Sequence, residues 1–165
     1  MPTTLPMPIE FRLPEGWYAV PPDQVGAPDV AFVALHPQPD AGFAANITID
    51  GEYRPDAATL AEIADESVQR MHEVAEKVTM TNRNEVGTTD APGLTQELIF
   101  STVAGSVRRD LVQPQVYLSL LDVNDPRKRS VIRLALTVTA AQYNSVLADF
   151  QDFVRTVRPE TRAAS

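Results

Sequence analysis

The stretch SVIRLALTVT, Ser130–Thr139, carries the clearest secondary-structure signal in the chain. Every second side chain is a large aliphatic one, and this period of two is typical of a β-strand. It is followed, over 140–158, by apolar residues at helical spacing, which predict a helix with one buried face. Thr139 and Gln142 match a capping box at the start of this helix, and Pro159 lies just past its end. This stretch therefore predicts a sheet with a helix packed against it.

A second amphipathic helix is predicted over 59–78. Thr59-Leu60-Ala61-Glu62 matches a capping box, and the apolar stripe that follows continues to Val78 opposite a mainly acidic face. Alternating or continuous apolar runs predict further strands at Ile9–Leu13, Trp17–Val20, Val30–Leu35, Ala44–Tyr53, Thr79–Val86, Thr95–Ala104 and Val107–Gln113, the last continuing as Gln115–Asp122. The order ββββαββββα, with short connections, predicts an α+β fold in which two long helices flank a mostly antiparallel sheet on both faces.

The length of 165 residues is that of one domain. Residues 1–8 contain three prolines and are expected to form a flexible tail. The predicted elements place a single domain at 9–158 and a second flexible tail at 159–165. Because Trp17 directly follows the turn Pro14-Glu15-Gly16, we expect it to be a buried anchor of this domain and not an exposed binding platform.

Two strands are candidates for the edge of the predicted sheet. Pro114 has no N–H to donate, so it indicates an edge or a bulge. The strand Ile9–Leu13 is protected from edge pairing only by Glu10 and Arg12. We therefore expect a partner strand, or a second copy of this chain, to dock at a sheet edge or sheet face with ion pairs at the rim.

Composition excludes several classes of function. The net charge is −8, residues 1–90 being strongly acidic, and such a chain repels nucleic acid. The chain has no cysteine, which excludes disulfides, thiolate metal sites and a cysteine nucleophile. No apolar run is long enough to span a membrane. Residues 1–8 contain neither a basic residue nor an apolar run typical of a secretory signal, so a cytoplasmic location is expected.

The residues that could carry chemistry favour no catalytic, cofactor or metal site. His36 is interpreted as a strand-end residue and His72 as a boundary residue of the first helix. Glu10 and Glu97 lie in predicted strands, but two acids must converge on one cleft to act as a pair. Two acidic segments, Asp50-Gly51-Glu52 and Asp122-Val123-Asn124-Asp125, are interpreted as turns and not calcium loops, and the basic cluster Arg127-Lys128-Arg129 as a solvated loop.

Three segments together resemble the PsbP-like α/β/α sandwich, and within it the actinobacterial LpqN/LpqT-type domain. They are the opening Phe11-Arg12-Leu13-Pro14-Glu15-Gly16-Trp17, the strand Ala45–Ile49, and the closing pair Val131–Leu134 and Phe150–Val154. The resemblance spans residues 9–158. It implies a non-enzymatic fold, since its members include a photosystem extrinsic subunit, a Ran-binding nuclear factor and chaperones for secreted effectors. Unlike the mycobacterial lipoproteins, this chain has no lipobox cysteine, and no family site maps onto its residues.

These observations lead to one functional hypothesis and two alternatives. We expect a non-enzymatic adaptor or chaperone-like module that binds another protein, for which a broad exposed apolar patch would be evidence. The first alternative is a domain that binds a small hydrophobic ligand between sheet and helix, in a closed, dry cavity. The second is an enzyme, which a cleft containing a carboxylate of perturbed pKa would favour.

Overall fold

The computed structural model describes residues 5–25, 27, 29–88, 91–104, 106–121 and 129–159. Its main feature is a seven-stranded antiparallel sheet in the order β2-β3-β4-β8-β7-β6-β5, and β1 pairs with β9 in a separate two-stranded sheet. The strands are β1 (Ile9–Glu10), β2 (Tyr18–Val20), β3 (Phe32–Leu35), β4 (Asn46–Tyr53), β5 (Glu76–Gly87), β6 (Pro92–Ala104), β7 (Val107–Leu121), β8 (Arg129–Thr139) and β9 (Arg158–Pro159). The helices are α1 (Leu60–Val74), α2 (Tyr143–Thr156) and the 3-10 helix η1 (Pro22–Val25). The predicted α+β class, antiparallel pairing and element order are confirmed.

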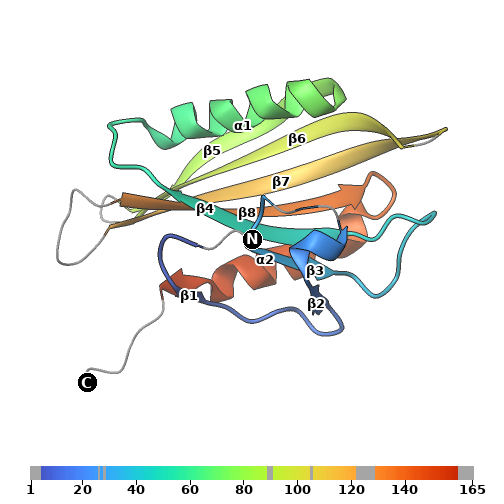
Figure 1. The fold of residues 1–165 in the computed structure, drawn as a ribbon, viewed down its shortest axis with the longest axis horizontal. Coiled ribbons are helices and arrows are strands. Elements are labelled where there is room, and N and C mark those ends of the chain that lie inside the picture. The colour runs from blue at the N-terminus through green and yellow to red at the C-terminus, as the bar shows by residue number, and fades with distance from the viewer. Residues whose placement is uncertain are drawn as a thin grey trace.

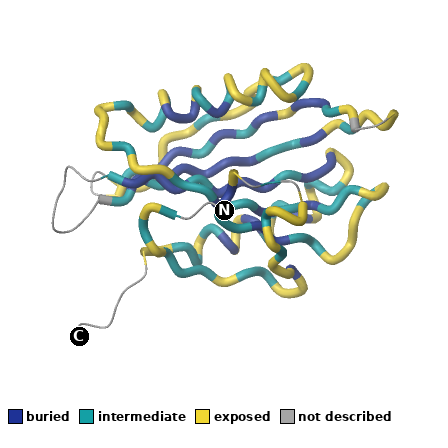
Figure 2. Tube along the Cα trace, viewed as in Figure 1, coloured by how far each residue is buried: buried dark blue, intermediate teal, exposed yellow. Residues whose placement is uncertain are grey.

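The two long helices cover opposite faces of the sheet, as the sequence predicted (Figure 1). Helix α2 buries Val146, Phe150 and Phe153 against one face, where Ile47 and Leu134 are fully buried. Helix α1 lies over β5, β6 and β7 on the other face and buries residues such as Ile63. Burial is concentrated in the central strands and the inner surfaces of the helices (Figure 2). Because strands between two helices are covered on both faces, β8 is buried at most of its positions, on both faces of the strand.

Helix α1 begins as predicted and ends four residues early. The Thr59 hydroxyl accepts from the Glu62 N–H at 3.1 Å, and the Thr59 N–H donates to the Glu62 carboxylate at 3.2 Å, which confirms the capping box. The helix ends at Val74, so the prediction that it reaches residue 78 was wrong. Lys77 has a φ of 55°, and the register shifts there as the chain turns into β5. The apolar stripe misled because Val78, although in the strand, still packs on the core under α1.

The prediction that Thr139 caps the second long helix was wrong, because that helix begins about one turn later. The Gln142 N–H does donate to the Thr139 hydroxyl, at 3.2 Å. Thr139, however, is the last residue of β8 and pairs with Leu111 in β7, so it cannot cap a helix. Helix α2 starts at Tyr143, with Gln142 as N-cap and no side-chain cap bond. The Thr139–Gln142 contact therefore stabilises the turn between β8 and α2.

Both expected sheet edges were wrong. Pro114 lies in β7, a central strand between β6 and β8. The pairing with β8 omits Gln113 and Pro114 but keeps its register on either side, while the pairing with β6 is continuous. A proline fits here because it has no N–H to donate and the backbone pairing with β8 is interrupted at this position. On that side the Gln113 side-chain amide instead donates to the Thr137 hydroxyl of β8 at 2.8 Å. The segment Ile9–Leu13 is not an edge of the main sheet, because only Ile9 and Glu10 form a strand, paired with β9. The edges are β2 and β5.

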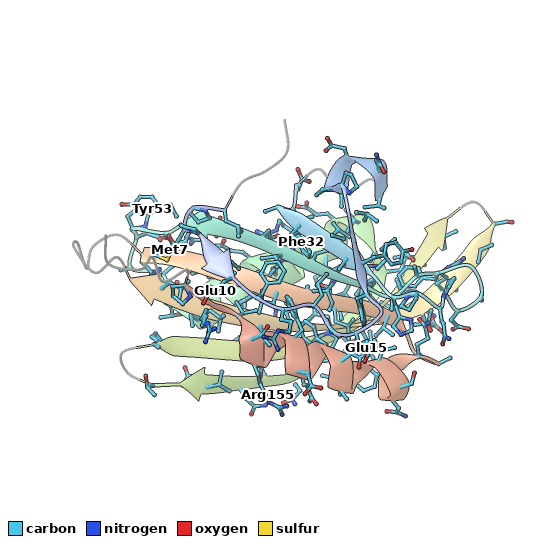
Figure 3. All side chains as sticks on the ribbon, turned by 90° about the horizontal axis from the view of Figure 1, so that it is seen from below. Met7, Glu10, Glu15, Phe32, Tyr53 and Arg155 are labelled. Atoms are coloured by element: carbon cyan, nitrogen blue, oxygen red, sulfur yellow. The ribbon has the colours of Figure 1, made fainter. Side chains whose placement is uncertain are left out.

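The N-terminal segment closes the layer that contains α2. Trp17 is 7% exposed, which confirms that it is a buried anchor. Its indole N–H donates to Asp149 of α2 at 3.0 Å, and its ring lies edge-on to His36 with centroids 5.2 Å apart. The Phe11 ring packs edge-on against Phe32, which is labelled in Figure 3, with ring centroids 4.9 Å apart. The residues before β1 contribute too, since Leu5 packs against the same core.

Candidate functional site

A cleft of about 570 Å³ opens where α1 overhangs the sheet, and we call it the α1 cleft. Helix α1 forms one wall, strands β4, β7 and β8 form the floor, and two residues after η1 form the opposite wall. The lining residues are Asp29, Val30, Asp50, Gly51, Glu52, Ile63, Ser67, Arg70, Met71, Glu73, Val74, Tyr117, Val131 and Arg133. The cleft exists because α1 lies over β5, β6 and β7 and does not extend over β4.

The floor of the α1 cleft is a row of three polar side chains on neighbouring strands. Asp50 of β4 pairs in register with Arg133 of β8, which in turn pairs with Tyr117 of β7. The Arg133 Nη2 donates to the Asp50 carboxylate at 2.8 Å. Tyr117 is 1% exposed and donates through its hydroxyl to the Gln115 side chain at 2.7 Å. Cross-strand pairing thus brings together Asp50 and Arg133, which are 83 positions apart in the chain, and Tyr117 and Arg133, which are 16 apart.

Ser67 connects this row to α1. Its hydroxyl accepts from the Arg133 Nη1 at 2.8 Å and from the Arg70 Nη2 at 3.2 Å. The Nε of Arg133 is buried and has no hydrogen-bond partner in the part of the chain that the structure describes. Ser67 and Asp50 therefore hold the two terminal nitrogens of the guanidinium, while its Nε–H makes no hydrogen bond to the described residues. A buried donor without a partner costs free energy.

Burial and neighbouring side chains shift the pKa values of all three floor residues. Removal from water raises the pKa of the Asp50 carboxyl above its ordinary value, although Arg133 opposes this shift. Burial also raises the pKa of the Tyr117 hydroxyl. For Arg133, burial favours the neutral form, but the Asp50 carboxylate and the Tyr117 hydroxyl together outweigh it and raise its pKa. The side chains of the Asp50–Arg133 pair are each 24% exposed.

The rim of the α1 cleft is acidic. Asp29, Glu52 and Glu73 line it, against one exposed base, Arg70. Glu52 is paired with Arg54 at 2.6 Å. Neither Asp29 nor Glu73 forms an ion pair within the described residues. Since the floor pair is internally neutral, the rim has an excess of negative charge.

Apolar side chains stand between the acids of the rim. Val74, at the last turn of α1, is 76% exposed, and Met71 lies one turn before it on the cleft side. Val30 faces them from the opposite wall. An exposed aliphatic side chain beside carboxylates suits a ligand that is itself both apolar and charged.

Of the candidate residues that the sequence singles out, the α1 cleft contains Asp50 and Glu52, while both histidines, Glu10 and Glu97 lie elsewhere. His36 follows β3 and contacts Trp17, which confirms that it lies at the end of a strand, and His72 is exposed on α1. Glu10 pairs with Arg158 at 2.6 Å in the small sheet. Glu97 lies in β6 and accepts from Tyr143 of α2, whose pKa is raised to about 12 by burial and by that carboxylate. The two glutamates form no acid pair.

The residue that sequence reasoning missed is Asp50. The interpretation of Asp50-Gly51-Glu52 as a turn is wrong, because all three residues lie within β4 and pair with β8. The polar face of the predicted strand contained the signal, since a charged residue on a strand covered by a helix needs a partner. Asp122–Asp125, Arg127 and Lys128 lie outside the described residues. Arg129 begins β8 and lies 3.7 Å from Asp56.

The lining of the α1 cleft meets one of the conditions expected of an enzyme. A carboxylate of perturbed pKa in a cleft is the feature expected of an enzyme, and Asp50 meets that condition. However, Asp50 is held by Arg133, and neither histidine lines the α1 cleft to serve as a base for Ser67. No cluster of three potential metal ligands occurs among the described residues. No helix in the described part of the chain is long and apolar enough to span a membrane.

Comparison with known proteins identifies the fold and not a family. No protein-family model matches the chain, and no curated protein matches it in sequence. Several solved structures do match. LpqN of Mycobacterium tuberculosis, involved in cell envelope biogenesis, has a TM-score of 0.64 at 10% identity, covering 93% of this chain and 86% of LpqN.

Two further matches come from distant organisms. Cyanobacterial PsbP (CyanoP) from Synechocystis has a TM-score of 0.58 at 16% identity, covering 92% of this chain and 86% of its own. The Ran-binding protein Mog1p of Saccharomyces cerevisiae has a TM-score of 0.59 at 15% identity, and the match covers 92% of this chain and 89% of Mog1p. The chain therefore has the PsbP/Mog1-like fold, as its resemblance to that group implied. None of the three is named for an enzymatic activity, and at these identities the likeness concerns the fold alone.

Proposed function

We propose that this chain is a non-enzymatic binding module whose α1 cleft receives a basic segment of a partner protein. The observation that carries this proposal is the rim, where Asp29 and Glu73 are without ion pairs among the described residues on either side of an exposed apolar wall. The net charge of −8 acts in the same direction, because it attracts a basic partner at long range. The partner is a protein, in keeping with the adaptor function expected from the sequence.

A lysine or arginine side chain fits this surface in two parts. Its aliphatic stem can lie along Met71 and Val74, while its charged head reaches Glu73 or Asp29. Arg70 remains on the rim and disfavours a second cation beside it, so the cleft selects a segment with isolated basic residues. The neutral Asp50–Arg133 pair beneath gives the floor hydrogen-bonding capacity without net charge.

A small amphiphilic ligand is the second candidate, and the size of the α1 cleft favours it. About 570 Å³ lies in the ordinary range of small-molecule sites, and the cleft lies between sheet and helix as the ligand hypothesis required. Its lining is charged, so it is not the dry, closed cavity that a purely hydrophobic ligand needs. A ligand of this kind would carry an amine.

The test is a titration of the isotope-labelled protein, followed by NMR, with two matched peptides. One peptide alternates lysine with leucine, and the other has glutamate in place of lysine. We expect shifts confined to Asp29, Val30, α1, β4, β7 and β8 with the basic peptide, and none with the acidic one. Glu73→Gln should weaken binding about two- to fivefold, while Glu15→Gln, which changes another exposed acid outside the cleft, should not. Equal binding of both peptides, or shifts away from the cleft, would contradict the proposal, and saturation by an alkylamine alone would favour the small ligand.

A further inference from the structure

Strand β5 is a long edge strand of the main sheet, and the α1 cleft does not involve it. It has twelve residues and pairs on one side with β6, while its outer side has no partner strand among the described residues. The opposite edge, β2, has three residues. In Figure 1, β5 lies at the upper margin of the sheet beneath α1. An unpaired edge of this length exposes a row of N–H and C=O groups that can pair with another strand.

Only half of this edge is protected. Register shifts between Glu76 and Thr79 and between Met80 and Asn82 distort the first half, and Lys77 adds a left-handed φ of 55°. Bulges and lysines are devices that block edge pairing. The second half, Asn82–Gly87, pairs with β6 without any shift and contains neither proline nor lysine. It is therefore a regular strand edge whose charged residues are Arg83 and Glu85.

The charges in this half restrict how a second copy can pair with it. Arg83 and Glu85 are two residues apart and project on the same face of the sheet, toward α1. An antiparallel two-fold centred on Arg83 or on Glu85 would place like charges directly opposite each other, which is unfavourable. A two-fold axis at Asn84 instead places Arg83 of each copy opposite Glu85 of the other, so that two pairs of opposite charges form.

We propose that two copies of this chain pair antiparallel through Asn82–Val86, with the two-fold axis at Asn84, to form one sheet across the dimer. Arg83 donates two N–H groups to Gln96, and its Nη1 lies 2.8 Å from Asp65, so at least two of its five N–H groups remain for the second copy's Glu85. Asn84 is exposed and its amide donates to Asn82 at 2.9 Å, so neither side chain is needed elsewhere in the fold. Val86, 43% exposed, gains cover opposite Asn82.

The α1 helices permit this pairing. Both would lie on the same face, because a two-fold perpendicular to the sheet keeps the faces in common. If α1 is centred near β6, three strand spacings separate the two helix axes, about 14 Å in all. Helices pack at about 8–10 Å, so the two copies do not clash.

The test is the oligomeric state of charge variants at the axis. In sedimentation, we expect wild type to form a dimer as its concentration rises toward about 1 mM. Asn84→Lys and Asn84→Asp each place like charges opposite each other and should weaken the dimer about fivefold. Mixed together, they should form the Lys–Asp heterodimer in native mass spectrometry in more than the half expected of random exchange.

The control is Asn144→Lys, which adds the same charge at an exposed position on α2 and should leave the dimer intact. Circular dichroism spectra and thermal midpoints confirm that every variant is folded. A wild type that stays monomeric overturns the proposal. So does an equal loss of dimer with Asn84→Lys and Asn144→Lys, or a mixture that pairs at random.

Discussion

Replacement of Trp17 by alanine tests how the N-terminal segment is held on the sheet. The side chain is 7% exposed, packs in the core beneath α2, and donates its indole N–H to Asp149. Removal of a buried aromatic side chain costs about 3–5 kcal/mol, because the transfer free energy is lost and a cavity remains. We expect a loss near the middle of that range, since the segment around Trp17 can partly collapse into the space.

The hydrogen bond can be separated from the packing. Trp17→Phe keeps most of the ring and removes the N–H, so we expect a loss of about 1–2 kcal/mol. Asp149→Ala removes the acceptor, which is partly exposed, at a cost of about 1 kcal/mol. Because both changes remove the same bond, the double variant should lose less than the sum of the two singles.

Urea unfolding followed by far-UV circular dichroism measures these free energies. Tryptophan fluorescence cannot be compared across the series, because Trp17 is the single tryptophan of the chain. If the free energy of unfolding falls with urea concentration at the same slope in every variant, the variants expose the same surface on unfolding. A loss below about 1 kcal/mol for Trp17→Ala would refute the reasoning that the ring anchors the domain. If the losses from Trp17→Phe and Asp149→Ala are fully additive in the double variant, the Trp17–Asp149 hydrogen bond contributes no free energy.

Three further predictions follow from local contacts, each read from urea midpoints. Thr59→Ala removes the N-cap of α1 and should cost about 1 kcal/mol, whereas Thr59→Ser should cost little. Hydrogen bonds from Arg54 lower the pKa values of Asp56 and Glu66 below 3.8 and 4.5, so their stabilisation is present above about pH 4.5 and lost at lower pH. The stability difference between wild type and Arg54→Met should accordingly shrink below that pH; a constant difference would contradict the ion-pair explanation. Gly51→Ala places a methyl 2.8 Å from an isoleucine δ-carbon of β8 and should cost about 1–3 kcal/mol, and an unchanged midpoint would show that β4 can shift.

Local sequence predicted the elements well because their causes are local. The period of two in Ser130–Thr139 and the helical spacing after Thr59 reflect which side chains must face a core. The burial of Trp17 was likewise foreseeable from the turn before it. The end of α1 was not, because Val78 satisfies the helical period and the inward face of β5 alike.

Strand order and the candidate site depended on the tertiary structure. Pro114 looks like an edge residue in isolation, and only the pairing of β7 with both β6 and β8 shows that the sheet tolerates it in the centre. Asp50, Tyr117 and Arg133 have no relation in the sequence, and register across three strands brings them into contact. Local periodicity determines which face a residue takes, but the partner across the strand depends on long-range pairing, which no short stretch encodes.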